Sequence, residues 1–267
     1  MLEAARTILA SIFLFYSSWS DYKTREVSNS VWVIFAPIAL ILTLIEVFLY
    51  ESSQLLFYGF CFGLTAAFAI ILFYSGGFGG ADSKALMCLA LALPFFPKKL
   101  FNPLLAGGIS PLSQILFPIT IFSNSVLMAA ATGIYMFLHN IFWHKKTGRK
   151  LYEGTLAKES FVKKIVVLIT SYKVSVAKLK EKWHVYPMED IEETEEGMFR
   201  RKLVVIPKDE GRNAIVERLA TAVETGNIDD HVWATPGLPM LIFITAGLII
   251  ALLFGDIIWI FIRFMLG

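Results

Sequence analysis

The chain has 267 residues, of which 56% are hydrophobic, 14% aromatic and only 17% charged. So much apolar surface exceeds what an ordinary soluble core hides, and it predicts a polytopic α-helical membrane protein that lies in a lipid bilayer. The formal net charge of +2 is too small to indicate nucleic-acid binding.

Six segments, taken in chain order, approach the length of roughly 20 mainly apolar residues that a helix needs to cross the hydrocarbon. They cover about residues 6–20, 30–50, 54–75, 84–96, 117–143 and 238–266. The fourth segment is short because Pro94 and Pro97 stand at its end, so its helix could begin before Asp82 or be sheltered by its neighbours. We therefore expect about six transmembrane helices.

A polar region, residues 144–236, separates the fifth and sixth apolar segments. It opens with the basic run HKKTGRK at residues 144–150, and basic residues directly after a span favour the cytoplasmic side. We therefore expect three parts: residues 1–143 with five membrane helices, residues 144–236 as a small α+β cytoplasmic domain, and residues 237–267 as the sixth helix.

Four stretches of the polar region suggest local structure. Residues 174–176 and 202–206 are predicted to be short strands. Residues 156–182 mix apolar and basic side chains and could start as an amphipathic helix at the membrane surface. The acidic run at residues 189–196 is predicted to be a mobile, solvated loop.

Two aspartates stand at the ends of apolar segments, Asp21 after the first and Asp82 after the third. Because each crossing reverses the side of the membrane, we expect both carboxylates at the cytoplasmic boundary. Basic residues beside them agree with the positive-inside rule, whereas Lys98 and Lys99 fall on the expected outer side and count against it. The basic residues beside the aspartates are Lys23, Arg25 and Lys84.

Each aspartate taken alone has a structural explanation. Four glycines within residues 76–80 precede Asp82, and they could form a flexible turn that Asp82 caps, or let a substrate backbone come close. Asp21 could be a solvated helix cap with paired charges. Taken together, two carboxylates held close share one proton and can act as base and acid, which indicates a catalytic dyad.

The segments around both aspartates resemble one family. Residues 79–82, with the sequence GGAD, resemble the G-x-G-D or G-x-A-D element of type IV prepilin and archaeal preflagellin peptidases. The segment that begins at Asp21 is similar to the first-aspartate segment of that family, and residues 117–124 and 232–239 also look like preflagellin peptidases. The residues that carry the two aspartate motifs, besides the aspartates, are Gly79, Gly80, Ala81, Lys84, Lys23, Arg25 and Glu26.

The resemblance implies an aspartic endopeptidase with Asp21 and Asp82 as its catalytic residues. The implied substrates are pilin-like or flagellin-like precursors with a short basic leader, cut at the cytoplasmic membrane boundary. No metal or other cofactor is expected, and Cys61 and Cys88 lie in apolar stretches without any C-x-x-C pair in the chain. Bacterial relatives carry two such pairs linked to N-methylation, so we predict a peptidase without methyltransferase activity.

Two other functions are compatible with the sequence. One is a presenilin-like protease, which would favour aspartates deep within spans rather than at their ends. The other is a proton-coupled transporter with Asp21, Asp82 and Asp256 as a relay, although transporters more often show repeated halves. Among the remaining polar residues, we expect Glu46 to reach the membrane interface and Asn124 to make an interhelical hydrogen bond. We further expect Asp256 to pair with Arg263.

Overall fold

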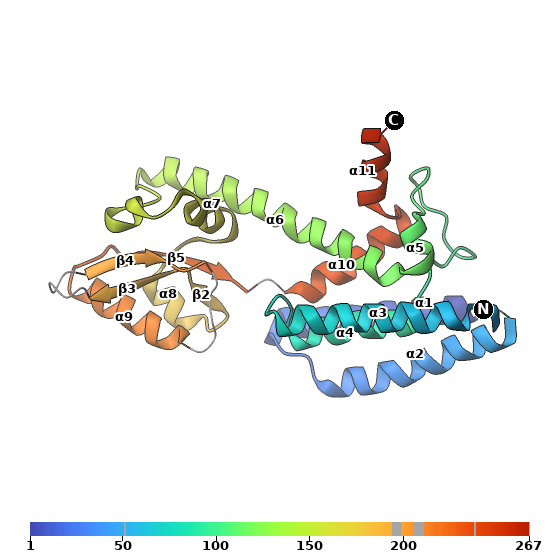
Figure 1. Cartoon of the computed structure of the whole chain (residues 1–267). Helices are drawn as coiled ribbons and strands as arrows, with labels where there is room; N and C mark the ends of the chain where they lie inside the picture. The colour runs from blue at the N-terminus through green and yellow to red at the C-terminus, as the bar shows by residue number, and fades with distance from the viewer. Residues whose placement is uncertain (51, 194–198, 206–210, 238, 267) are drawn as a thin grey trace. The chain divides into compact units, whose positions relative to one another are not determined.

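The computed structural model describes residues 1–50, 52–193, 199–205, 211–237 and 239–266. The chain divides into two compact units, residues 1–129 with 239–267 and residues 130–238 (Figure 1). The first unit is helical, and the second contains all the strands that the structure describes.

Four helices follow one another at the start of the first unit and pack side by side (Figure 1). They are α1 (Leu2–Thr24), α2 (Asn29–Tyr50), α3 (Leu55–Tyr74) and α4 (Gly80–Ala92), with the short 3-10 helix η1 (Ser52–Gln54) between α2 and α3. The unit also contains α5 (Pro111–Ile115), the start of α6 (Phe117–Thr147), α10 (Met240–Leu253) and α11 (Ile257–Leu266). Its core joins buried side chains of α1, α2, α4, α6 and α10, among them Leu14, Phe35, Leu89, Phe117 and Leu248.

Among the residues that the structure describes, three helical segments are long and apolar enough to cross a membrane: residues 29–50, 52–74 and 117–147. The pair α10 and α11 meets the same criterion together, with a bend of 55° between them. Of the six predicted spans, three or four are therefore confirmed. Helix α4 falls short because its 13 residues extend only about 20 Å. It begins at Gly80, so of the two alternatives left open for this helix, the structure agrees with a start before Asp82.

The last apolar segment was predicted to be one helix, and this was wrong, because the helix breaks at Gly255. Gly255 has a positive φ of 87°, and an added Cβ would collide with Gly108. The break is held from both sides, since Asp256 N donates to Gly108 O (2.8 Å) and Asn124 Nδ2 donates to Gly255 O (2.9 Å). Asn124 thus makes the interhelical bond expected of it. Asp256 is held differently than expected, because its carboxylate accepts a hydrogen bond from Ser110 Oγ (2.7 Å).

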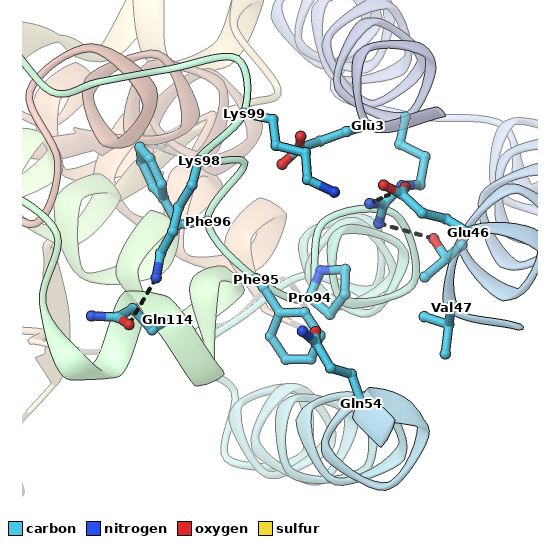
Figure 2. A pocket seen from close by; sticks show the side chains of 12 residues that line it. Glu3, Glu46, Val47, Gln54, Pro94, Phe95, Phe96, Lys98, Lys99 and Gln114 are labelled. Atoms are coloured by element: carbon cyan, nitrogen blue, oxygen red, sulfur yellow. Dashed lines mark hydrogen bonds and ion pairs between the residues drawn. The ribbon is translucent and has the colours of Figure 1, made fainter. Parts of the chain in front are cut away.

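A polar pocket lies at the N-terminal end of α1, the end opposite Asp21 (Figure 2). Glu46 lines it and forms an ion pair with Arg6 (2.5 Å), with only 12% and 11% of the two side chains exposed. The Arg6 cation thus compensates the Glu46 carboxylate, a partner that the expectation for Glu46 did not include. Lys98 and Lys99 line the same pocket: Lys98 Nζ donates to Gln114 Oε1 (2.8 Å), and the charge of Lys99 acts on Glu3 (Figure 2).

The second unit consists of short helices packed on two small antiparallel sheets (Figure 1). One sheet has the strand order β1-β5-β2 and the other pairs β3 with β4. The strands are β1 (Tyr172–Ser175), β2 (Val185–Pro187), β3 (Glu189–Glu193), β4 (Phe199–Leu203) and β5 (His231–Pro236). The helical elements, besides the end of α6, are η2 (Gly154–Lys158), α7 (Phe161–Thr170), α8 (Val176–Glu181) and α9 (Arg212–Glu224).

Two predictions for this unit need correction. The acidic run forms strand β3 over residues 189–193 instead of a loop, because arginines neutralise its buried carboxylates: Glu189 pairs with Arg201 (2.6 Å) and Asp190 with Arg218 (2.8 Å). The rest of the run, residues 194–196, lies outside the described residues. The predicted amphipathic helix is divided into η2, α7, β1 and α8. The predicted strands overlap β1 and β4, although Val176 already belongs to α8 and residue 206 is not described.

Candidate active site

Asp21 and Asp82 lie in the terminal turns of two helices that pack against each other. Asp21 is in the last turn of α1, which ends with Arg25 in the left-handed conformation (φ 58°). Asp82 is the third residue of α4. Both aspartates lie outside the candidate membrane spans, and each is partly buried.

The glycine-rich segment, residues 76–80, forms a turn that separates helices α3 and α4, as the sequence predicts. Gly76 has a positive φ of 76°, and the backbone N–H groups of Gly77 and Phe78 both donate to Leu72 O, which closes a tight turn. Glycine adopts the backbone conformation of this turn readily because it has no Cβ atom. The chain then enters α4 immediately before Asp82.

Asp82 caps its own helix from the third position. Its Oδ2 atom accepts a hydrogen bond from the Gly79 N–H (3.1 Å). An added Cβ at Gly79 would lie 3.1 Å from this same oxygen, so a glycine lets the carboxylate fold back onto the backbone. The capping role considered for Asp82 is thus present, and it leaves the other carboxylate oxygen for further contacts.

The surroundings of the two carboxylates shift their affinities for a proton. Burial raises the pKa of Asp82 to about 7, the negative charge of Asp21 adds to this rise, and the Gly79 N–H opposes it. Burial also raises the pKa of Asp21, whereas Arg25 and the backbone N–H of Leu241 lower it. A pair in which one carboxyl keeps its proton near neutral pH is the arrangement that acid and base catalysis by two carboxylates requires.

The basic motif residues have contacts of their own. Lys84 Nζ donates to Asn29 Oδ1 (2.6 Å) at the start of α2. Lys23 Nζ lies over the Trp19 ring, 4.3 Å from its centroid. Of the charged motif residues, Arg25 is the one whose charge acts on Asp21.

The remaining motif residues shape the backbone around the aspartates. The backbone oxygen of Glu26 accepts hydrogen bonds from Ser20 and Thr24, which closes the end of α1. Gly80 packs near the Phe73 ring, and Ala81 packs against the helical core. These residues therefore set the geometry of the two helix ends.

Sequence reasoning missed one element of this site, the first turn of α10. The backbone N–H of Leu241 is one of the groups that lower the pKa of Asp21, although the two residues are 220 positions apart. Ser18, one turn before Asp21 on α1, contacts the same turn of α10 through Leu241 O (2.9 Å). A serine and an aspartate three residues apart on one helix face are a weak signal, which by itself does not point to α10.

Two family models match the chain, and together they cover most of it. Residues 8–134, which contain both aspartates, match the type IV leader peptidase family, and residues 163–257 match the archaeal peptidase A24 C-terminus, type II. The chain belongs to the type IV leader peptidase family. This leader peptidase is 26% identical to the preflagellin peptidase of Methanococcus voltae over 255 residues, which is 91% of this chain and 92% of the relative. It is 21% identical to the preflagellin peptidase of Methanococcus maripaludis strain C6 over 261 residues, or 93% and 94% of the two chains.

Proposed function

We propose that this leader peptidase is an aspartic endopeptidase that removes the basic leader from preflagellin-like or type IV prepilin-like precursors, with Asp21 and Asp82 as its catalytic pair. Two observations support the proposal: both aspartates lie in terminal turns of helices that pack on each other, and the charge of Asp21 contributes to the raised pKa of Asp82. The two similar preflagellin peptidases support the substrate class.

In the proposed reaction the two aspartates act together on one water molecule. Protonated Asp82 transfers its proton to the scissile carbonyl oxygen, while ionised Asp21 takes a proton from the water. The water oxygen bonds to the carbonyl carbon and gives a tetrahedral intermediate. The carbon–nitrogen bond then breaks, the proton held by Asp21 passes to the leaving amine, and Asp82 recovers its proton.

The proposal includes the arrangement of the chain in the membrane. We propose that α1 and α4 also cross, with Asp21 and Asp82 at the boundary just outside their membrane-spanning residues, which makes six spans in all. Helix α1, with 23 residues, is about 35 Å long and can span a hydrocarbon core of about 30 Å. Helix α4 is shorter, but its contacts with α1, α2, α3 and α10 allow its end to lie within protein rather than lipid.

The basic run at residues 144–150 supports a cytoplasmic position for residues 144–236. Helix α6 crosses the membrane just before this run, so the chain that precedes α6 lies on the outer side. Each earlier span reverses the side again, which places Asp21 and Asp82 at the cytoplasmic boundary. A precursor that inserts its hydrophobic helix into the bilayer keeps its basic leader in the cytoplasm. The bond to be cut, between the leader and the hydrophobic helix, therefore lies at the same membrane boundary as the two carboxylates.

Co-expression of a preflagellin-like precursor with single variants tests the proposal. Asp21→Asn and Asp82→Asn should each abolish leader cleavage, read as a shift of the precursor on a gel, while both proteins still accumulate in the membrane fraction. The matched control is Asp229→Asn, since Asp229 pairs with Arg149 in the second unit and is 44% exposed. Cleavage by the parent should persist in EDTA. Processing that continues in either dyad variant would overturn the assignment.

A further inference from the structure

Helix α7 of the second unit turns its apolar side chains away from the unit. Phe161, Val162, Ile165 and Ile169 lie within about 100° of one another around the helix axis, and they form what we call the α7 apolar face. Their exposed fractions are 75%, 69%, 40% and 37%, whereas Val167, on the opposite side of the helix, is fully buried. A surface helix of a soluble domain shows the reverse pattern, with its apolar face toward the core.

The two lysines of α7 lie outside this face and are only partly exposed. Lys163 pairs with Glu159 (3.0 Å), and Lys164 Nζ donates to the backbone oxygen of Ala157. The ten residues of α7 are all described, and none on the α7 apolar face is polar. Water is therefore a poor solvent for this face, and a contiguous exposed apolar patch indicates a surface that something else covers.

The core of the second unit accounts only for the inner side of α7. Trp233 of β5 belongs to the same buried cluster as Val167 of α7. Its neighbours Val232 and Ala234 belong to the cluster that contains α9. Because successive side chains of a strand point to opposite faces of the sheet, α7 and α9 cover opposite faces (Figure 1). The α7 apolar face lies outside this packing.

The C-terminal end of α7 is attached to α6, one of the helices that are long and apolar enough to cross a membrane. Asn140 Nδ2 on α6 donates to Leu168 O (2.8 Å) and to Ser171 O (2.7 Å). The backbone of α6 is also close at Gly133, where an added Cβ would lie 3.5 Å from Ile169 O. A span of about 20 residues that begins at the first residue of α6 ends between these two attachment points. The attachment therefore lies at a membrane boundary.

Exposed basic side chains flank the same place. Lys145 and Lys146 follow the attachment points on α6, and Lys158 precedes α7 by three residues. An apolar helix face with lysines beside it is typical of helices that lie in the membrane interface, where the lysines meet anionic headgroups. On α6 itself, the exposed side chains Ile134 and Leu138 provide apolar surface at the same level of the chain.

We propose that the α7 apolar face is inserted into the headgroup and upper acyl region of the bilayer beside α6, with the three flanking lysines toward anionic lipid headgroups. The sequence suggests a surface helix within residues 156–182, and the structure restricts it to α7 and identifies the outward face. The proposal goes beyond the proteolytic function and uses from it only that α6 crosses the membrane. Insertion of α7 gives the second unit a lipid contact of its own.

The test measures the surroundings of a fluorescent label on the full chain in nanodiscs that contain anionic lipid and one copy of the protein. An NBD label is attached to Val162→Cys and, one turn further along the same face, to Ile165→Cys. The matched control is Ala214→Cys, because Ala214 is an exposed residue of α9, on the other face of the sheet. The parent chain gives the background, since its Cys61 and Cys88 are buried.

Both α7 labels should emit at shorter wavelength than the Ala214 label. Lipids that carry a nitroxide near the headgroup should quench them several-fold more strongly, and dithionite in the water should reduce them several-fold more slowly. Equal quenching and equal reduction at Val162 and Ala214 would overturn the proposal. So would protection that appears only after a precursor is added, because the face then binds substrate, or only in concentrated detergent solution, because it then binds a second copy.

This measurement is independent of the catalytic pair. The quencher reaches both sides of a nanodisc, so the result does not depend on which side of the membrane the second unit occupies. Cleavage by Asp21→Asn would refute the proposed peptidase mechanism and leave the labels protected. Exposed α7 labels would refute the lipid contact and leave the peptidase mechanism in place.

Discussion

Replacing Asp82 by Asn should stabilise the folded protein at high pH and have little effect at low pH. Burial raises the pKa of Asp82 from 3.8 to about 7, so the folded state prefers the protonated carboxyl. A group with a raised pKa contributes its full stability below the unfolded value and loses it as the pH rises toward the folded value. The shift of about three units, at about 1.4 kcal/mol each, sets an upper limit of about 4 kcal/mol for the cost of the ionised group above pH 7.

Asparagine removes this cost because it carries no charge, while its side-chain oxygen can still accept the Gly79 N–H. Thermal unfolding in detergent at pH 4, 6 and 8 measures the effect. At about 2–4 °C per kcal/mol, Asp82→Asn should raise Tm by at most about 8–16 °C at pH 8 and by much less at pH 4. The exposed Asp229→Asn should give the same small difference at all three pH values. A Tm difference for Asp82→Asn that does not grow with pH would refute the reasoning.

Two other substitutions probe the helix packing through the same thermal measurement. Arg6→Ala should lower the free energy of unfolding by about 3–5 kcal/mol, because it leaves the Glu46 carboxylate buried without its cation. A double variant, Arg6→Met with Glu46→Leu, should recover most of this loss. Equal stability of the single and the double variant would contradict this account. Gly247→Ala should destabilise by about 1–3 kcal/mol, because its Cβ would collide with Ser125, whereas Gly63→Ala has open space and should be neutral or slightly stabilising. A Gly247→Ala protein as stable as Gly63→Ala would show that α10 and α6 do not pack this closely.

Properties that depend on neighbouring residues could be predicted from the sequence. The apolar runs predict the helices of the first unit, and the glycines before Asp82 predict the break between α3 and α4, because helix length and backbone freedom are local properties. The spacing of Asp21 and Asp82 at the ends of apolar segments likewise placed both carboxylates at helix ends. The family resemblance, which the matches to the type IV leader peptidase family later confirmed, rested on these same short segments.

Properties that depend on distant partners could not be predicted in this way. Glu46 has Arg6 as its cation, the acidic strand β3 has Arg201 and Arg218, and the last apolar segment breaks where Gly108 meets Gly255. The cost of a buried charge or of a kink is set by the groups that surround it, and hydropathy along the chain does not contain them.

The same distinction applies to the candidate active site. The sequence by itself determined that two carboxylates stand at helix ends near a glycine-rich turn. Only the tertiary structure decided that Leu241, from the last part of the chain, helps to lower the pKa of Asp21, and that burial raises the pKa of Asp82 to about 7. The physical reason is that a carboxylate's affinity for its proton depends on burial and on the dipoles and charges aimed at it, and these are properties of packing between helices.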